Sequence, residues 1–380
     1  MICRFHTHTC YQNFSYEHIS ESNLPIVNLK DPGVSFKLLS ALEDWGFSYI
    51  TGHDIPMHII GNAFKKNKIF FELPMRVKRQ VKADRNLALK TSRGYTKFKA
   101  EQLDVSSNGR PDLKEVFDIG HIGRSPGNNA QHYLGRNKWP KSPRVRRPNV
   151  QQGQRFRGKR DVGKEIKNTM ETYASHVSKL AKTILQLTFN ELDCREEFEE
   201  MFGPDSLQVQ RLTRYPASDD VSEIETGQIG AGVHSDYGGI TILSAEGTGL
   251  YVLKLNRSSE YTDKGTFSDE LEVPNSKNWI EVPSIKGTFI AMAGEALQRL
   301  SNGRIYAVKH KVELRQEKPR YSLAFFYDPN PEAILTPLNC ARKNGMPLYN
   351  AKIAGHKGVI KKVTSRLGYQ HPNWYGSNMI

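Results

Sequence analysis

The sequence lacks the features that mark secreted, membrane-spanning and disulfide-stabilised proteins. It has four cysteines in 380 residues, too few for the disulfide framework of a small extracellular fold. The longest apolar runs, such as residues 287–293, are far shorter than the roughly 20 residues of a membrane-spanning helix. The first residues lack the apolar centre of a secretory signal. These absences predict a protein of a reducing compartment, the cytoplasm, without membrane association; entry into the nucleus stays open.

Acidic residues are missing from one strongly basic stretch. Residues 136–160 contain ten Lys or Arg and no Asp or Glu, and they account for most of the net charge of +14. Such a run is usually a solvated loop, and binding of a polyanion is the alternative. The sequence has no nucleic-acid-binding motif, so nucleic acid is not an expected partner. We predict a surface loop that takes no part in a catalytic site and acts mainly through its charge.

The spacing of apolar residues along the chain predicts helices in the first half and a β-rich core in the second half of one globular unit. Residues 1–22 have the composition of a flexible tail, and residues 23–200 alternate short strands with helices that pack on the core. Residues 201–370 hold the core, whose strands are rich in β-branched and aromatic residues. The expected fold is mixed and mainly β: a double-stranded β-helix, or jelly roll, with flanking α-helices. The expected core strands are 207–215, 240–244, 249–255, 279–282, 288–293, 306–314 and 320–327.

Two metal-binding side chains occur at strand spacing. His234 and Asp236 lie two positions apart in the stretch 232–239, and in an extended chain such residues point to the same face. This pair alone is a weak signal. Alternation in residues 306–313 places His310 on an inward, apolar face. By itself His310 is more simply a buried core histidine, but two His and one carboxylate together form the facial arrangement of oxygen-activating iron(II).

A second set of residues is suited to an anion. Arg320 and Ser322 share one face of the last expected strand, and a guanidinium beside a hydroxyl can bind a carboxylate through charge-assisted hydrogen bonds. An inward-facing Arg is costly unless an anion meets it. Arg211 and Tyr215 share a face of the strand 207–215, and the Tyr215 hydroxyl can donate to the same carboxylate.

The order of these motifs along the chain, a His-x-Asp pair, a distal His and then an Arg-x-Ser pair, resembles that of the isopenicillin-N-synthase-like family of iron(II)- and 2-oxoglutarate-dependent dioxygenases. The resemblance extends over about residues 24–370. Two departures, the polar insertion at 256–277 and the long basic segment, leave the candidate ligands intact. The matching positions are His234-x-Asp236, His310, Arg320-x-Ser322, Arg211, Tyr215-Pro216, Trp45-Gly46-Phe47, His53, 70–74, Gly94-Tyr95, 112–120, 137–140 and 301–304.

The resemblance implies a specific activity. Iron(II) would be bound by His234, Asp236 and His310, and 2-oxoglutarate would be a co-substrate held by Arg320, Ser322, Tyr215 and Arg211. Molecular oxygen would oxidise a small-molecule substrate with release of succinate and carbon dioxide, and ascorbate would be a possible reductant. Two alternatives stay open: an iron oxidase of the same fold that does not use 2-oxoglutarate, and a non-enzymatic scaffold that binds a polyanion. The sequence does not indicate the substrate or the oligomeric state.

Overall fold

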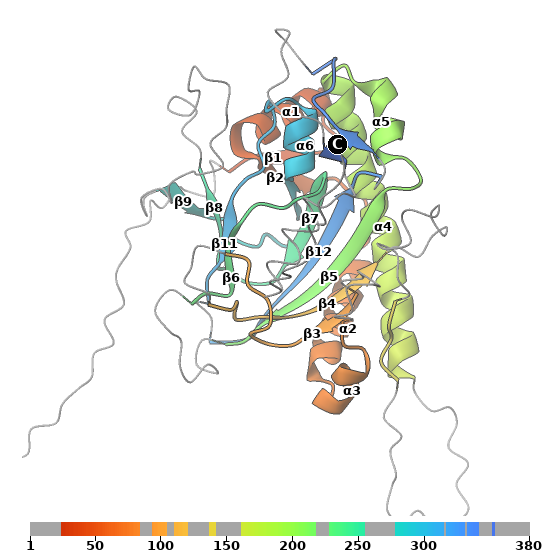
Figure 1. The fold of residues 1–380 in the computed structure, drawn as a ribbon, viewed down its shortest axis with the longest axis vertical. Coiled ribbons are helices and arrows are strands. Elements are labelled where there is room, and N and C mark those ends of the chain that lie inside the picture. Colours follow the sequence, from red (N-terminus) through yellow and green to blue (C-terminus); the bar gives the residue numbers. More distant parts are fainter. Residues whose placement is uncertain are drawn as a thin grey trace, which may run out of the picture.

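Two β-sheets that share a buried core form the centre of the molecule (Figure 1). The computed structural model describes residues 24–83, 93–104, 110–120, 137–141, 161–217, 228–254, 278–314, 317–330, 333–341 and 352–353. The large sheet has the order β1 (Ile26–Asn28), β2 (Phe47–Thr51), β10 (Phe289–Ala293), β7 (Ile240–Ala245), β12 (Arg320–Asp328), β5 (Leu207–Tyr215), β4 (Glu115–Gly120), β3 (Gly94–Thr96). The small sheet has the order β6 (Ala231–His234), β11 (His310–Val312), β8 (Leu250–Leu253), β9 (Trp279–Glu281).

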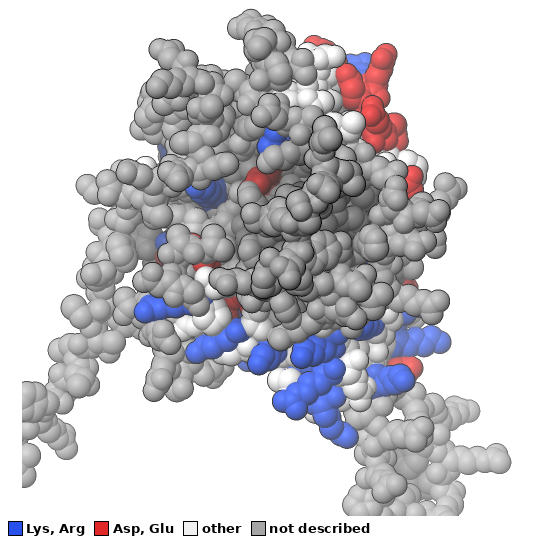
Figure 2. All heavy atoms as spheres, viewed as in Figure 1, with Lys and Arg blue, Asp and Glu red and all other residues white. Residues whose placement is uncertain are grey.

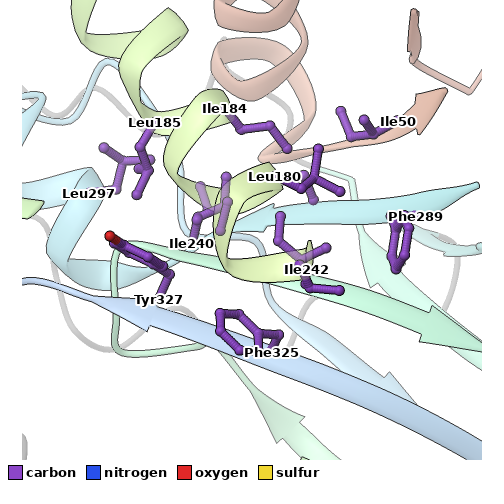
Figure 3. Close-up of a cluster of buried hydrophobic side chains, with 14 of the residues drawn as sticks. Ile50, Leu180, Ile184, Leu185, Ile240, Ile242, Phe289, Leu297, Phe325 and Tyr327 are labelled. Carbon is purple, nitrogen blue, oxygen red and sulfur yellow. The ribbon is translucent and has the colours of Figure 1, made fainter. Parts of the chain in front are cut away.

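The helices cover the outer face of the large sheet. The longest, α4 (Val162–Glu191), carries an apolar stripe with a spacing of three and four residues, and the stripe is buried. Figure 3 shows Leu180 and Ile184 of this helix above Ile242 and Phe325 of the sheet. The other helices are α1 (Val34–Trp45), α2 (Met57–Glu72), α3 (Met75–Gln80), α5 (Arg195–Phe202) and α6 (Glu295–Leu300). A short pair, β13 (Ile334–Leu335) and β14 (Lys352–Ile353), completes the described elements.

Alternation along each strand sorts side chains between two cores. On β7, Ile240 and Ile242 face the helices, whereas Leu243 joins the cluster between the two sheets. On β12, Leu323 and Phe325 face the helices, so Arg320 and Ser322 point to the space between the sheets. This inner space is packed with apolar side chains, among them Val252, the direct partner of His310 on the neighbouring strand, and the polar residues project into it.

The N-terminal strands belong to the same large sheet as the core strands. β2 pairs with β10, and β4 pairs with β5, so residues far apart in the chain lie side by side. Helix α1 ends at Gly46, which has a φ of 70° and lies so close to the Tyr306 carbonyl that a Cβ would clash with it. The Trp45-Gly46-Phe47 motif is therefore a tight connection between α1 and β2.

Most expected elements are present at nearly the expected bounds. The expected strand 306–314 is wrong in length, because only His310–Val312 is regular and its pairing with β6 shifts register after His310. A second correction concerns cysteine. Cys194 and Cys340 form a disulfide with Cα atoms 5.4 Å apart, although the low cysteine count had predicted a protein without a disulfide framework. The expected tail 1–22, the insertion 256–277 and residues 142–160 of the basic segment lie outside the described residues.

Charge is unevenly distributed over the described surface. Figure 2 shows Lys and Arg gathered at the lower end, around α3 with Arg76 and Arg79, and Asp and Glu around α5 at the opposite end. Positive charge is therefore not confined to the basic segment. None of the described helices has the length and apolar composition that crossing a bilayer requires; the cytoplasmic location stays a prediction.

Candidate metal centre and co-substrate site

Three candidate ligands converge between the two sheets. His234 ends β6 and His310 begins β11, and these two residues are direct partners in the antiparallel pairing of the strands. Asp236 follows two residues after His234, and its Oδ1 lies 3.9 Å from His234 Nε2 and 3.8 Å from His310 Nε2. All three ligand atoms lie within 4.8 Å of one another. Register and sequence spacing thus create one cluster that can hold a metal ion.

Backbone carbonyls orient both imidazoles. His234 Nδ1 lies 2.7 Å from the Gly232 carbonyl oxygen, and His310 Nδ1 lies 3.1 Å from the Val308 carbonyl oxygen. A carbonyl can only accept, so each Nδ1 carries the hydrogen and each Nε2 keeps its lone pair for a metal. The neutral tautomer that a metal requires is therefore already selected at both histidines.

Thr241 fixes the third ligand. Its hydroxyl donates to Asp236 Oδ2 at 2.5 Å, whereas Oδ1 of the same carboxylate faces the two imidazoles. The backbone also holds this turn, because the Glu295 N–H donates to the Asp236 carbonyl at 2.8 Å and Ser235 Oγ donates to Glu295 Oε1 at 2.7 Å. The sequence analysis did not single out Thr241. Its alternation with Ile240 and Ile242 was the available signal for an inward-facing hydroxyl.

A second, half-buried carboxyl group lies beside the cluster. Burial, and next the charge of Asp236, raise the pKa of Asp328 to about 7, while a hydrogen bond from the Gly239 N–H opposes the shift. Asp328 ends β12 on the inner face, next to Gly238. The sequence analysis also missed this residue, because a carboxyl group at the end of a strand usually reaches solvent.

Arg320 is a buried cation with unused hydrogen-bonding capacity. The residue is 5% exposed, and its Nε has no hydrogen-bond partner among the described residues. Burial lowers the pKa of Arg320, and Tyr215 opposes this shift. The guanidinium lies 5.1 Å from the centre of the Tyr215 ring, its direct neighbour across β5 and β12. A buried guanidinium with a free N–H is an incomplete site that a carboxylate would complete.

The neighbours of Arg320 are small hydroxyl residues. Ser322 is buried two positions along β12, and Thr213 is buried directly opposite it on β5. Both point inward by the alternation of their strands. Thr213 was missed in the sequence analysis, where only Arg211 and Tyr215 of this strand were selected. Hydroxyl donors next to a buried guanidinium fit an anion better than an apolar or cationic group.

Arg211 is paired with two carboxylates of this chain. It faces inward as expected, but its Nε and Nη2 each donate to Asp118 at 2.8 Å, and it also pairs with Glu101. Both carboxylates are buried. That Arg211 binds 2-oxoglutarate together with Arg320 stays a prediction, and in the structure its donors are used by two carboxylates of this chain.

The same ion pairs continue to the strand that carries His234. Lys114 pairs with Glu101 at 2.9 Å and with Asp112 at 3.1 Å, and Asp112 Oδ1 accepts the Gly232 N–H at 2.9 Å. Burial raises the pKa of Glu101, but Arg211 and Lys114 outweigh it and bring the pKa to about 2. This ionised network holds the loop before β4 against the start of the metal-binding strand.

Known proteins are similar to this chain in sequence and in fold. A model described as non-haem dioxygenase in morphine synthesis N-terminal matches residues 24–142, and one described as 2OG-Fe(II) oxygenase superfamily matches residues 204–329. The 2-oxoglutarate-Fe(II) type oxidoreductase hxnY of Emericella nidulans is 29% identical over 312 residues, 80% of this chain and 76% of its own length. Homoarginine-6-hydroxylase 2-ODD-C23.1 of Arabidopsis thaliana is 26% identical and covers 87% of this chain and 88% of its own length.

Among solved structures, full-length Neurospora crassa T7H in complex with alpha-KG superposes with a TM-score of 0.67 at 23% identity, over 92% of this chain and 98% of that one. The chain belongs to the 2OG-Fe(II) oxygenase superfamily. It is a 2-oxoglutarate-dependent dioxygenase, an oxidoreductase that uses iron(II). The expected family, jelly-roll core and enzyme class, and the expected use of iron(II) and 2-oxoglutarate, are thereby confirmed; ascorbate stays a prediction.

Proposed function

We propose that His234, Asp236 and His310 hold the iron and that the enzyme oxidises a small molecule. The observation that carries this assignment is the convergence of two Nε2 atoms and one carboxylate oxygen, with both imidazole tautomers set by carbonyls. Two imidazoles and one carboxylate leave positions open on a six-coordinate ion for a chelating co-substrate and oxygen. These residues therefore fit iron(II) in number, type and protonation.

We further propose that Arg320, Ser322 and Tyr215 bind the distal carboxylate of 2-oxoglutarate, with Thr213 beside them. The unpartnered Nε of Arg320 and its 5% exposure support this role. A carboxylate at this position would remove the cost of burying a lone cation. Arg320 thus fixes the orientation of the co-substrate along β12, with its other end toward the metal ligands.

Bound iron and oxygen would supply the oxidation, in which 2-oxoglutarate becomes succinate and carbon dioxide and the substrate is oxidised. The chain positions the reactants and excludes water. Thr241 keeps one oxygen of Asp236 occupied, so that the other faces the ion. The apolar cluster between the sheets includes Val252, the strand partner of His310, and keeps water away from this side of the ligand.

The names of relatives do not define the substrate. They include a homoarginine-6-hydroxylase and validamycin A dioxygenase, which act on chemically different compounds. We therefore limit the proposal to a small molecule. The alternative of an oxidase without 2-oxoglutarate is disfavoured by the buried, incomplete site at Arg320.

The test is oxygen-dependent release of succinate from 2-oxoglutarate by the full chain with iron(II). Turnover is expected even without the primary substrate, at a slow uncoupled rate, and it should be lost in His310→Ala. Ser284→Ala, which changes an exposed side chain, is the matched control. If His310→Ala keeps the affinity for iron and the turnover of the parent, or if no 2-oxoglutarate is consumed, the proposal is wrong.

A further inference from the structure

The disulfide joins two segments that are far apart in the sequence and differ in exposure. Cys194 lies at the corner between α4 and α5, and Cys340 lies near the end of the described segment 333–341. Cys194 is fully buried, whereas Cys340 is partly exposed. In a reducing compartment, such as the cytoplasm that the sequence predicts, the disulfides that do form are usually redox-sensing or catalytic. The bond is open to a reductant through Cys340 Sγ.

Both sulfur atoms lie beside an oxygen that can accept a thiol hydrogen. Cys194 Sγ is 3.4 Å from the Leu192 carbonyl oxygen, and Cys340 Sγ is 3.2 Å from Glu197 Oε1. A sulfur atom in a disulfide carries no hydrogen, so it cannot donate to these oxygens while the bond is intact. After reduction, each thiol has an acceptor within reach. The surroundings of the two cysteines therefore suit the reduced form as well as the disulfide.

The segment 333–341 packs on one end of α6. The Leu338 N–H donates to the Leu300 carbonyl at 3.0 Å. Leu335 and Leu338 are buried in the same apolar cluster as Leu297 and Leu300 of this helix. Helices α5 and α6 lie at the same end of the molecule (Figure 1). The disulfide thus fastens a segment that contacts α6 to the corner where α5 begins.

The other end of α6 holds the metal-binding turn. The Glu295 N–H donates to the Asp236 carbonyl at 2.8 Å, and the Ser235 hydroxyl donates to Glu295 Oε1 at 2.7 Å. Gly294 packs so closely on this turn that a Cβ would lie 2.3 Å from the Gly238 carbonyl oxygen. The helix has six residues and is therefore about 9 Å long. One short helix contacts both the segment fastened by the disulfide and the turn that carries Asp236.

We propose that Cys194 and Cys340 form a reversible thiol–disulfide site that controls how tightly the metal-binding turn holds its ion. With the disulfide closed, the segment 333–341 is fixed against α6, and α6 keeps Asp236 in place. With the bond reduced, only the packing of the segment holds it, so the turn is less well ordered and binds the metal more weakly. This inference rests on the proposed function, because it takes Asp236 as a metal ligand.

Reduction of the site requires a dithiol. A thiolate of the dithiol attacks Cys340 Sγ, the exposed sulfur, and the S–S bond breaks. Cys194 leaves with the electron pair and takes up a proton. The second thiolate of the reductant then displaces Cys340, which also takes up a proton, and the reductant becomes a disulfide. Reoxidation by the disulfide form of a dithiol reverses both exchanges.

The experiment compares the full chain in its two redox states. Mn(II) is the probe, because it keeps its oxidation state during the treatment. The protein is reduced with dithiothreitol and desalted under argon, and its thiols are counted by alkylation and mass spectrometry. Reduction is expected to weaken Mn(II) binding by at least about 5-fold, the lower end of typical coupling between two sites. Reoxidation should restore the affinity.

Three variants separate this role from a general loss of stability. Cys340→Ser should bind Mn(II) as the reduced parent does and should not respond to dithiothreitol. The double variant Cys3→Ser/Cys10→Ser lacks the other two cysteines of the chain and should keep the full response. Leu323→Ala removes a fully buried side chain of β12 and should lower stability while the affinity for Mn(II) stays at the parental value.

The proposal is overturned if the oxidised and the reduced parent bind Mn(II) equally, if their thiol counts are the same, or if Cys340→Ser still responds to the reductant. It is also overturned if Leu323→Ala loses as much affinity as reduction does, because the effect would then be one of stability alone. The comparison of the parent in two states needs no substitution, so it decides the question even if Cys340→Ser does not fold. Failure of the proposed function has a different signature: Asp236→Ala would bind Mn(II) as the parent does in both redox states.

Discussion

The two faces of β12 differ in what their residues do for the protein. The face toward the helices carries Tyr321, Leu323, Phe325 and Tyr327, all buried in one apolar cluster. The opposite face carries Arg320 and Ser322, which are as well buried but polar. Burial of the apolar side chains on the outer face stabilises the folded state by itself. On the inner face, Arg320 Nε has no hydrogen-bond partner among the described residues, so under the proposed function one strand provides stability on one side and chemistry on the other.

The largest effect, on iron(II) binding, is expected when a metal ligand on the inner side is removed. Asp236→Ala leaves two imidazoles without the carboxylate that faces them. We expect loss of measurable iron(II) binding in equilibrium dialysis, with the far-UV circular dichroism unchanged. Asp205→Ala, at a residue exposed to solvent, should bind iron as the parent does. If Asp236→Ala bound iron(II) with the affinity of the parent, the metal would not be bound by these residues on the inner face.

Leu323→Ala tests the outer face. The side chain is fully buried beneath the helices, and such a truncation typically lowers the free energy of unfolding by about 2–5 kcal/mol. Denaturant unfolding should detect this loss, while the affinity of the folded variant for 2-oxoglutarate stays unchanged. A large change in that affinity with normal stability would mean that the two faces are not functionally separate.

Arg320→Leu removes the only arginine of β12 from its inner face. Losing a hydrogen bond to a charged group costs roughly 1.5–3 kcal/mol, or about 10- to 150-fold in affinity for 2-oxoglutarate. Calorimetric titration measures this directly. Because an unpaired buried cation is removed, the apo variant should be at least as stable as the parent. Unchanged dependence on 2-oxoglutarate would instead favour the oxidase alternative.

Thr241→Val removes one hydroxyl and keeps the shape of the side chain. Loss of a partner that orients a metal ligand typically reduces metal affinity by about 10- to 100-fold. Titration with Mn(II) or iron(II) should show this loss, and Thr241→Ser should restore most of the affinity. If valine and serine behave alike, the contact with Asp236 does not position the ligand.

The smallest effect concerns acid stability. The pKa of Glu101 is lowered from 4.5 to about 2 by Arg211 and Lys114, which outweigh the effect of burial. Its ionised form therefore stabilises the fold fully above pH 4.5, and this contribution is lost as the pH falls toward 2. Glu101→Gln should flatten the fall of the melting temperature in that range. An identical pH profile in both proteins would show that the pair contributes nothing.

The sequence predicted the local features of the fold well. Strand β5 was expected at its observed bounds, because the alternation of side chains along a strand is a local signal. Helices α5 and α6 were missed. They have eight and six residues, too few for a helical repeat to stand out from the neighbouring loops.

The residues of the candidate site were predictable where their spacing in the sequence alone determines that they share a face of a strand. His234 and Asp236 share a face in any extended chain, whereas the pairing of His310 with His234 depends on register between strands 76 positions apart. Thr241, Thr213 and Asp328 are common residue types whose importance appears only when the strands are aligned. The true partners of Arg211 depend on β4, which pairs with β5 from 93 positions away.

The disulfide between Cys194 and Cys340 has a topological consequence. The two cysteines are 146 positions apart, and His234, Asp236, His310, Tyr215 and Arg320 all lie between them. Residues 194–340 are thus closed into a covalent ring, and the strands β1 to β4, which pair with this part of the large sheet, lie outside the ring. A chain cut once anywhere within this ring remains one molecule until a reductant opens it, so a nicked core would migrate as intact protein on a non-reducing gel.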